Sequence, residues 1–463
     1  MRNMTLEAIA DAVDGKLENV GRFDLTKEAT SVVIDSRQIE EGGIFVATVG
    51  ERVDGHSFID QVFKKGALGV ICEKLPAKPK GPCIVVDDSF AAIRKLARYY
   101  RNQISLKVVG IVGSVGKTST KELVASVLAA HYEVLKTEGN FNNEVGVPLT
   151  VFKIRDGHEV AVIEMGISKF GEMERLGEIV RPDVVVFTNI GPCHLEYLGD
   201  LDGVFKAKTE VIEKMSPSGT LVLNGQDEKL GLIDKELSGG RNIIRYGKES
   251  KRDDVYASNI ENLGLDGSRF IANFPDGSHY EMTVPLPGYH MVDNAVAAAA
   301  VGFLLGLNLE EIRRGMLSVE ALSGRGHIIR TDKYTIVDDC YNANPRSMNA
   351  ALDTLGYALT RKVAILGDMY ELGDETEKLH ADVGDYAASS GVDSLIFVGP
   401  LAKHMYKGAM QHEGVEIRYY PNRELLLAAL SDTTKEILKP GDAILVKASH
   451  GMGFSEVVEF LKK

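Results

Sequence analysis

A glycine-rich segment carrying a lysine and a threonine has the composition of a phosphate-binding loop. Residues 113–118 read Gly-Ser-Val-Gly-Lys-Thr, between the apolar run 108–112 and a helical run over 121–130. Glycines let backbone N–H groups approach phosphate oxygens, and Lys117 and Thr118 add a charge and a hydroxyl suited to Mg²⁺. The spacing is shorter than a strict Walker A loop, which has glycine where this chain has Ile111. The flanking strand and helix argue against a glycine turn with an incidental lysine.

Two further polar side chains follow predicted strands. Glu164 comes after the run 160–163, and His194 lies downstream of the run 184–187. Ligands of parallel sheets gather where strands end, so Glu164 is a candidate Mg²⁺ ligand, with a surface-turn carboxylate as the alternative. His194 alone is more often a structural or solvent-facing residue, and its position at a third strand end leaves metal binding equally open.

A lysine lies on the apolar side of a predicted helix. Over residues 202–215, Val204, Lys208, Val211 and Met215 share one face at helical spacing. A lysine directed inward either snorkels to the surface or pairs with a charged group. Periodicity alone favours snorkelling.

Composition limits the class of protein. The 463 residues exceed what one hydrophobic core usually supports, and 44% hydrophobic with 26% charged residues is a globular balance. A formal net charge of −13 argues against nucleic-acid binding. Four scattered cysteines without a CxxC pair, no signal peptide and no apolar run of membrane-spanning length predict a cytoplasmic protein without membrane insertion.

Three stretches that differ in their pattern of strands and helices must position these residues. Residues 1–103 mix short strands with helices, and 104–319 repeat an apolar strand followed by a helix. A third stretch, 320–463, carries strand candidates at 335–337, 363–366, 395–398 and 443–446. Continuous Val/Ile runs are typical of parallel sheets covered on both faces. The prediction is an α/β protein with a small N-terminal α/β domain, a central P-loop-type, mostly parallel sheet and a C-terminal Rossmann-like domain.

Several motifs together resemble one family over nearly the whole chain. The most specific are the loop 113–118, Asp-Cys-Tyr-Asn-Ala-Asn-Pro at 339–345 and Leu-Gly-Asp-Met-Tyr-Glu-Leu-Gly at 366–373, supported by segments 35–37, 54–56 and 139–148. The sequence resembles the Mur ligases, ATP-dependent amide ligases of peptidoglycan precursor synthesis. The second and third motifs resemble the member that adds a dipeptide.

The resemblance implies substrates and a chemistry. The expected reaction joins D-alanyl-D-alanine to UDP-N-acetylmuramoyl-tripeptide through an acyl phosphate, with an N-terminal domain for the UDP-sugar, a central ATPase and a C-terminal domain for the amine. ATP and two Mg²⁺ ions, one held through a carbamylated Lys208, are the implied cofactors, and a monomer is expected. A sibling ligase using a single amino acid, or a non-catalytic nucleotide-binding regulator, remains the alternative.

The resemblance also implies roles for individual residues. Lys117, Glu164, His194 and Lys208 are the expected catalytic residues, and Thr118, Glu164, His194 and carbamylated Lys208 the expected metal ligands. ATP would be bound by Gly113, Ser114, Val115, Gly116, Lys117, Thr118, Ser119, Asn294, Arg325 and Asp339. Substrate would be bound by Ser36, Arg37, Asn140, Asn142, Asn143, Asn342 and Asn344. The chain departs from the family pattern at Val115, Met291 and His450, and neither His290 nor His450 is given a role.

Overall fold

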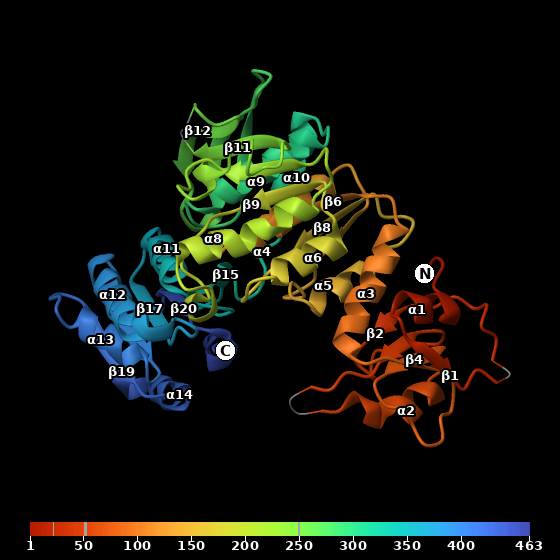
Figure 1. Ribbon diagram of the computed structural model, residues 1–463. Coiled ribbons are helices and arrows are strands. Elements are labelled where there is room, and N and C mark those ends of the chain that lie inside the picture. Colours follow the sequence, from red (N-terminus) through yellow and green to blue (C-terminus); the bar gives the residue numbers. More distant parts are fainter. Residues whose placement is uncertain (22, 51–52, 249–250) are drawn as a thin grey trace.

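Strands of the protein form three separate sheets. The computed structural model describes residues 1–21, 23–50, 53–248 and 251–463, and within these ranges helices pack against every sheet. Figure 1 shows the N-terminal and C-terminal parts on opposite sides of a central body. The predicted α/β fold with three sheet-based units is confirmed.

The N-terminal unit holds a small sheet that is parallel except for its first strand, which runs antiparallel. In spatial order its strands are β1 (Lys16–Glu18), β5 (Cys83–Val85), β4 (Gly69–Cys72), β3 (Ile44–Val46) and β2 (Val32–Val33). Its helices are α1 (Leu6–Ala12), α2 (Ile59–Lys64) and α3 (Ser89–Asn102). Asp88 caps α3 by accepting from the N–H groups of Phe90 and Ala91.

The central unit holds the largest sheet, which is parallel apart from the second strand from one edge, which pairs antiparallel with both of its neighbours. In order its strands are β14 (His279–Val284), β13 (Ser268–Asn273), β12 (Val255–Asn262), β11 (Asn242–Lys248), β10 (Thr220–Asn224), β9 (Val184–Phe187), β6 (Lys107–Val112), β8 (Val160–Glu164) and β7 (Val134–Lys136). Its helices are α4 (Lys117–Leu128), α5 (Gly146–Val151), α6 (Glu172–Val180), α7 (Leu195–Leu198), α8 (Leu201–Thr209), α9 (Met291–Leu304) and α10 (Leu309–Leu317).

Both faces of this central sheet are covered. Along β6, Val108 and Val112 pack into a core with α5 and α6, whereas Val109 and Ile111 pack into a second core with α4 and α9. A strand that is buried on both faces needs apolar residues at every position. This explains the unbroken Val/Ile runs of the sequence.

The C-terminal unit repeats the pattern on a smaller scale. Its strands, in order, are β15 (His327–Arg330), β16 (Thr335–Asp338), β20 (Ala443–Lys447), β17 (Lys362–Gly367), β18 (Ser394–Val398) and β19 (Glu416–Tyr420), with only β15 antiparallel. Its helices are α11 (Pro345–Gly356), α12 (Thr376–Ser389), α13 (Ala402–Ala409), α14 (Arg423–Ser431) and α15 (Ser455–Leu461).

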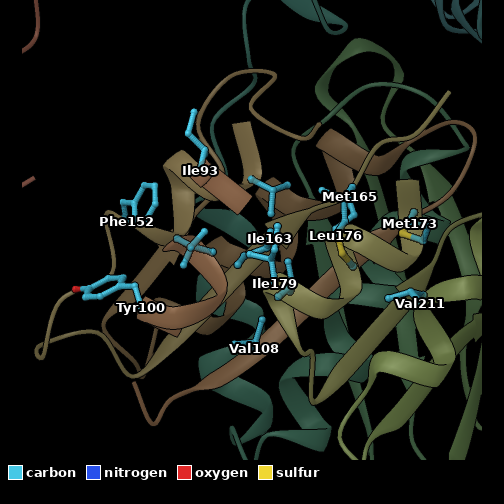
Figure 2. Close-up of a cluster of buried hydrophobic side chains, with 14 of the residues drawn as sticks. Ile93, Tyr100, Val108, Phe152, Ile163, Met165, Met173, Leu176, Ile179 and Val211 are labelled. Atoms are coloured by element: carbon cyan, nitrogen blue, oxygen red, sulfur yellow. The ribbon is translucent and has the colours of Figure 1, made fainter. Parts of the chain in front are cut away.

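Helix α3 joins the N-terminal unit to the central one through a shared core. Ile93 and Tyr100 of α3 lie in the same buried cluster as Phe152, Ile163 and residues of α6 (Figure 2). The Tyr100 hydroxyl donates to the carbonyl of Ile154 at 2.7 Å, so its one polar atom is satisfied inside this apolar contact.

One helix is shorter than the sequence predicts. The helix expected over 202–215 is α8 only to Thr209, and a 3₁₀ segment continues from Glu210 to Lys214. Within the described parts of the chain, no helix combines the length and apolarity needed to cross a bilayer. The limits placed at residues 103 and 319 remain a prediction.

Candidate active site

The glycine-rich segment forms a tight turn between strand β6 and helix α4. Gly113 has φ +153°, and a Cβ there would lie 1.9 Å from the Thr188 hydroxyl oxygen. Gly116, with φ +82°, occupies the left-handed position directly before α4. Both positions require glycine, one for lack of space and the other for its backbone angle. The N–H groups that open α4 are therefore directed at this turn.

The next strand end holds this loop in place. The Ser114 N–H donates to the Asn189 carbonyl at 3.0 Å, and the Val115 N–H donates to the Asn189 side chain at 3.1 Å. The Thr188 hydroxyl donates to the Val115 carbonyl at 2.6 Å. Segment 188–191, downstream of β9, is thus a second wall of the site, which the sequence did not reveal.

Lys117 folds back across the loop. Its Nζ donates to the carbonyls of Gly113 at 2.8 Å and Ser114 at 3.3 Å. Burial lowers the pKa of Lys117, while the nearby Glu164 carboxylate opposes the shift. The ammonium is held at the centre of the turn, where a phosphate group would meet it.

Glu164 is directed into the same site and has one unsatisfied oxygen. Its side chain is 1% exposed, and Oε1 accepts from the Thr118 hydroxyl at 3.1 Å and from Asn142 Nδ2 at 2.8 Å. Oε2 is buried and has no hydrogen-bond partner among the described residues. A buried carboxylate oxygen without a donor calls for a cation. With the Thr118 hydroxyl beside it, the donor set fits Mg²⁺, which prefers oxygen ligands.

Lys208 is buried on the apolar face of α8. It is 1% exposed, beside Val204 and Val211, and its ammonium has no hydrogen-bond or ion-pair partner among the described residues. With 1% of the residue exposed, Lys208 does not lie along the surface as the snorkelling that periodicity favours would require. The helix α8 packs against α6. Burial lowers the pKa of Lys208 to about 8, and Lys117 contributes to the lowering by repulsion.

His194 connects the central and C-terminal units. It has φ +51° directly before α7, and its Nδ1 lies 3.2 Å from Oε2 of Glu371. Burial lowers the pKa of His194, and repulsion from Lys208 adds to the shift. The charges of Lys208 and Lys117 are therefore near enough to His194 to affect its pKa.

Residues of the C-terminal unit form a second group. Asp339 pairs with Lys447 at 2.6 Å, and Lys447 Nζ also donates to the Asn342 carbonyl at 3.0 Å. Burial raises the pKa of Asp339, although Lys447 opposes this. The Arg325 guanidinium lies 4.0 Å above the ring of Tyr341, a cation–π contact. Repulsion from Arg325 also contributes to the lowered pKa of Lys117.

The asparagines expected to bind substrate or nucleotide differ in their surroundings, and their roles stay a prediction. Asn142 binds Glu164, Asn143 accepts from the Gly146 N–H at 2.9 Å, and Asn344 caps α11 by accepting from the Ser347 N–H at 2.9 Å. Asn342 accepts from its neighbour Ala343 at 2.9 Å. Asn140 is exposed, and Asn294 lies beside the loop, 3.3 Å from where a Cβ of Gly116 would be.

The N-terminal candidates lie apart from the loop. Arg37 pairs with Asp35 at 2.8 Å, and the Ser36 carbonyl accepts from Lys65 at 2.9 Å. No hydrogen bond or ion pair found in the described chain joins them to residues 113–119. A role for Ser36 and Arg37 in binding substrate stays a prediction.

Several residues of the site were missed from the sequence. Lys447 ends strand β20, Glu371 lies in the segment 366–373, and Arg346 Nη1 comes within 3.6 Å of where a Cβ of Gly191 would be. A lysine closing an apolar strand is a usable signal for Lys447. Arg346 and Glu371 meet the central unit only in three dimensions, which the sequence does not encode locally.

The chain is similar to known proteins over its whole length. Family models match in three consecutive pieces: "Mur ligase family, catalytic domain" at residues 28–104, "Mur ligase middle domain" at 111–302 and "Mur ligase, glutamate ligase domain" at 324–450. The chain is 34% identical to the UDP-N-acetylmuramoyl-tripeptide–D-alanyl-D-alanine ligase of Bacillus subtilis (strain 168), covering 100% of this chain and 99% of the relative.

Solved structures agree with this result. MurF from Acinetobacter baumannii superposes with a TM-score of 0.90 at 32% identity, covering 99% of each chain. MurF ligase from Thermotoga maritima in complex with ADP superposes with a TM-score of 0.81 at 28% identity, covering 93% of this chain and 97% of that one. With a phosphate loop, a buried carboxylate beside it and these full-length matches, the chain belongs to the Mur ligase family.

Proposed function

We propose that the protein joins D-alanyl-D-alanine to UDP-N-acetylmuramoyl-tripeptide, using ATP and releasing ADP and phosphate. The observation that carries this proposal is the phosphate loop 113–118 with Glu164 beside it, in a chain aligned end to end with relatives named for this reaction. The relative solved with ADP supports the use of ATP. The product would be the pentapeptide precursor of peptidoglycan.

The reaction needs an activated carboxyl group. A carboxylate does not condense with an amine in water, because its leaving group would be oxide. Transfer of the γ-phosphoryl group to the tripeptide carboxylate gives an acyl phosphate and ADP. The amine of D-alanyl-D-alanine then attacks the acyl carbon, and the tetrahedral intermediate expels phosphate. Lys117 and the N–H groups opening α4 would stabilise charge on the transferred group.

Mg²⁺ would be held by Thr118 and Glu164, and a second ion by Glu164, His194 and a carbamylated Lys208. When bound, these ions supply charge neutralisation at the phosphoryl oxygens. The unsatisfied Oε2 of Glu164 supports the first assignment. A carbamate on Lys208 is supported by its burial and by its pKa of about 8, since the neutral amine is the form that reacts with CO₂.

We further assign the parts of the chain. Residues 1–103 would bind the UDP-sugar, 104–319 ATP and 320–463 the incoming amine. Asn294, Arg325 and Asp339, which lie around the junction of the last two units, would contact the nucleotide. A monomer in the cytoplasm fits a reaction that uses ATP and a chain whose four cysteines are free.

A panel of amines tests the proposal. ADP release with UDP-N-acetylmuramoyl-tripeptide should depend on the added amine and be far faster with D-alanyl-D-alanine than with D-alanine, L-lysine or glutamate. Equal rates with a single amino acid would assign the chain to a sibling ligase. ADP release that ignores every amine would instead indicate a nucleotide-binding regulator.

A further inference from the structure

Two hydrogen-bonded paths connect Glu164 to helix α4. In the first, the Thr118 hydroxyl donates to Glu164 Oε1 at 3.1 Å. In the second, the Glu164 N–H donates to the Thr137 hydroxyl at 3.0 Å, and Lys121 Nζ donates to the Thr137 carbonyl at 2.6 Å. Thr118 and Lys121 are one turn apart on α4, so they lie on the same side of the helix. The two paths form a closed ring that holds both the side chain and the main chain of Glu164.

The second path depends on a charge in an unusual place. Lys121 is 0% exposed, and its ammonium pairs with Glu122 at 2.8 Å. Glu122 also pairs with Lys136 at the surface. Burying an ammonium is costly even when it is paired, and an apolar side chain of similar length would fill the space at lower cost. The energy of burial therefore does not explain why an ammonium stands at position 121.

Thr137 links the ammonium of Lys121 to the main chain of Glu164. It is 0% exposed just beyond β7, and its N–H donates to the Val162 carbonyl at 3.0 Å. Its carbonyl, hydroxyl and N–H all have partners, from α4 on one side and β8 on the other. The end of β8 is therefore clamped where Glu164 leaves the sheet.

We propose that Lys121 and Thr137 are positioning residues for the metal-binding carboxylate. They fix the Glu164 main chain relative to α4, so that Oε2 stays directed at the phosphate loop and does not turn to find a donor of its own. The inference rests on the proposed function only in taking Glu164 as a ligand of Mg²⁺–nucleotide. Partners that orient metal ligands typically change metal affinity by about 10- to 100-fold when removed.

Thr137→Val tests the ring with the least change of shape. It removes the hydroxyl that accepts from the Glu164 N–H and leaves the carbonyl that accepts from Lys121. We expect Mn²⁺ binding in the presence of ADP, followed by EPR, to weaken about tenfold. The Mg²⁺ concentration for half-maximal ADP release should rise similarly, with the KM for D-alanyl-D-alanine unchanged. Thr137→Ser should restore both.

Thr150→Val is the matched control. Thr150 is also a buried threonine, but its hydroxyl donates to the Gly146 carbonyl within α5. This variant should lower the thermal midpoint without changing Mn²⁺ affinity. If Thr137→Val behaves in the same way, the positioning role is wrong.

Lys121→Met provides the second, independent arm. It keeps an unbranched side chain only one atom shorter and leaves Glu122 paired with Lys136. Mn²⁺ affinity should fall here too, and an unchanged affinity would overturn the proposal even if Thr137→Val failed to fold. If the wild-type protein used no amine while both variants bound Mn²⁺ more weakly than it does, positioning would stand and the proposed ligase reaction would fail.

Discussion

At the scale of single residues, the site gathers three nitrogen side chains with lowered pKa values near one buried carboxylate. Lys117, Lys208 and His194 all have a pKa lowered first by burial, and each is also affected by another cation of the group. Arg325 adds its guanidinium from the C-terminal unit. The positive charges of Lys117 and Arg325 favour an anionic ligand. A nucleotide phosphate therefore suits this side of the site better than a neutral group does.

Lys117→Ala should abolish turnover and leave the fold intact. Its ammonium contacts only two loop carbonyls and is partly exposed, so its loss opens no cavity in the core. We expect ADP release to fall at least about 100-fold, as when a transition-state charge partner is removed. Far-UV circular dichroism and the thermal midpoint should match wild type. Lys95→Ala, at an exposed lysine paired with Asp14, is the control, and retained turnover above a few per cent in Lys117→Ala would contradict the loop assignment.

Lys208→Ala should remove activity that short carboxylic acids partly restore. The substitution deletes the amine on which a carbamate would form and leaves a space near His194 that acetate or propionate can enter. Wild type in ¹³CO₂-enriched buffer should show a carbamate carbon signal that the variant lacks. Lys206→Ala, at an exposed position of the same helix, should keep full activity. Full activity of Lys208→Ala without added acid would rule the role out.

Residue-scale features were predictable where the covalent sequence carries the geometry. Gly113, Gly116, Lys117 and Thr118 are adjacent in sequence, and their spacing alone indicated a phosphate loop. The contact of Asn142 with Glu164 joins two strand ends that only the fold brings together. The burial of Lys208 depends on which face of α8 meets α6. Helical periodicity shows which residues share a face, but not what packs against that face.

At the scale of elements, the site is built from successive strand ends. β6 leads into the phosphate loop, β8 ends at Glu164 and β9 leads into the wall 188–191. These three strands are neighbours in the sheet and run parallel, so their carboxyl ends meet at one edge. The order β9-β6-β8 places the loop between its wall and its carboxylate.

Gly113→Ala should separate β6 from β9 at this edge. A Cβ at Gly113 would lie 1.9 Å from the Thr188 hydroxyl, whose hydrogen bond to Val115 holds the loop. We expect a loss of stability of about 1–3 kcal/mol and a large loss of nucleotide affinity, measured by chemical denaturation and ADP titration. Gly157→Ala is the control, because no atom lies within 4 Å of its Cβ position. Equal ADP affinity in the two variants would show that the loop does not need its contact with Thr188.

Elements were predicted unequally, for a physical reason. The buried parallel strands β6, β8 and β9 are continuous apolar runs and were all anticipated. The strands β12, β13 and β14 were not, because they form a half-exposed edge where buried and polar residues alternate. Strand β19, at an edge of the C-terminal sheet, was missed in the same way.

At the scale of the molecule, the two junctions between units differ in kind. The N-terminal and central units share one apolar core through α3 (Figure 2). The C-terminal unit has cores of its own, against which Leu265 of the central unit packs. Its links to the central unit also include the polar contacts His194–Glu371 at 3.2 Å and Arg330–Asp266 at 2.7 Å. A cavity of about 500 Å³, lined by Tyr289 and His290 on one side and Asp353 and Tyr357 on the other, lies at the same junction. Polar, incompletely packed junctions permit relative motion, which an enzyme that shields an acyl phosphate from water needs.

The difference between the two junctions predicts two separable unfolding transitions. Ile93→Ala in α3 and Leu395→Ala in β18 each remove a side chain that is 0% exposed, at a cost of about 2–5 kcal/mol. Since Ile93 lies in the shared core, its loss should lower the midpoint of a transition that includes both the N-terminal and central units. Leu395→Ala should lower only the other transition, which a fragment of residues 320–463 should reproduce by itself in calorimetry. If each substitution shifts every transition by the same amount, the three units unfold as one body, and the polar junction couples them as firmly as the shared core does.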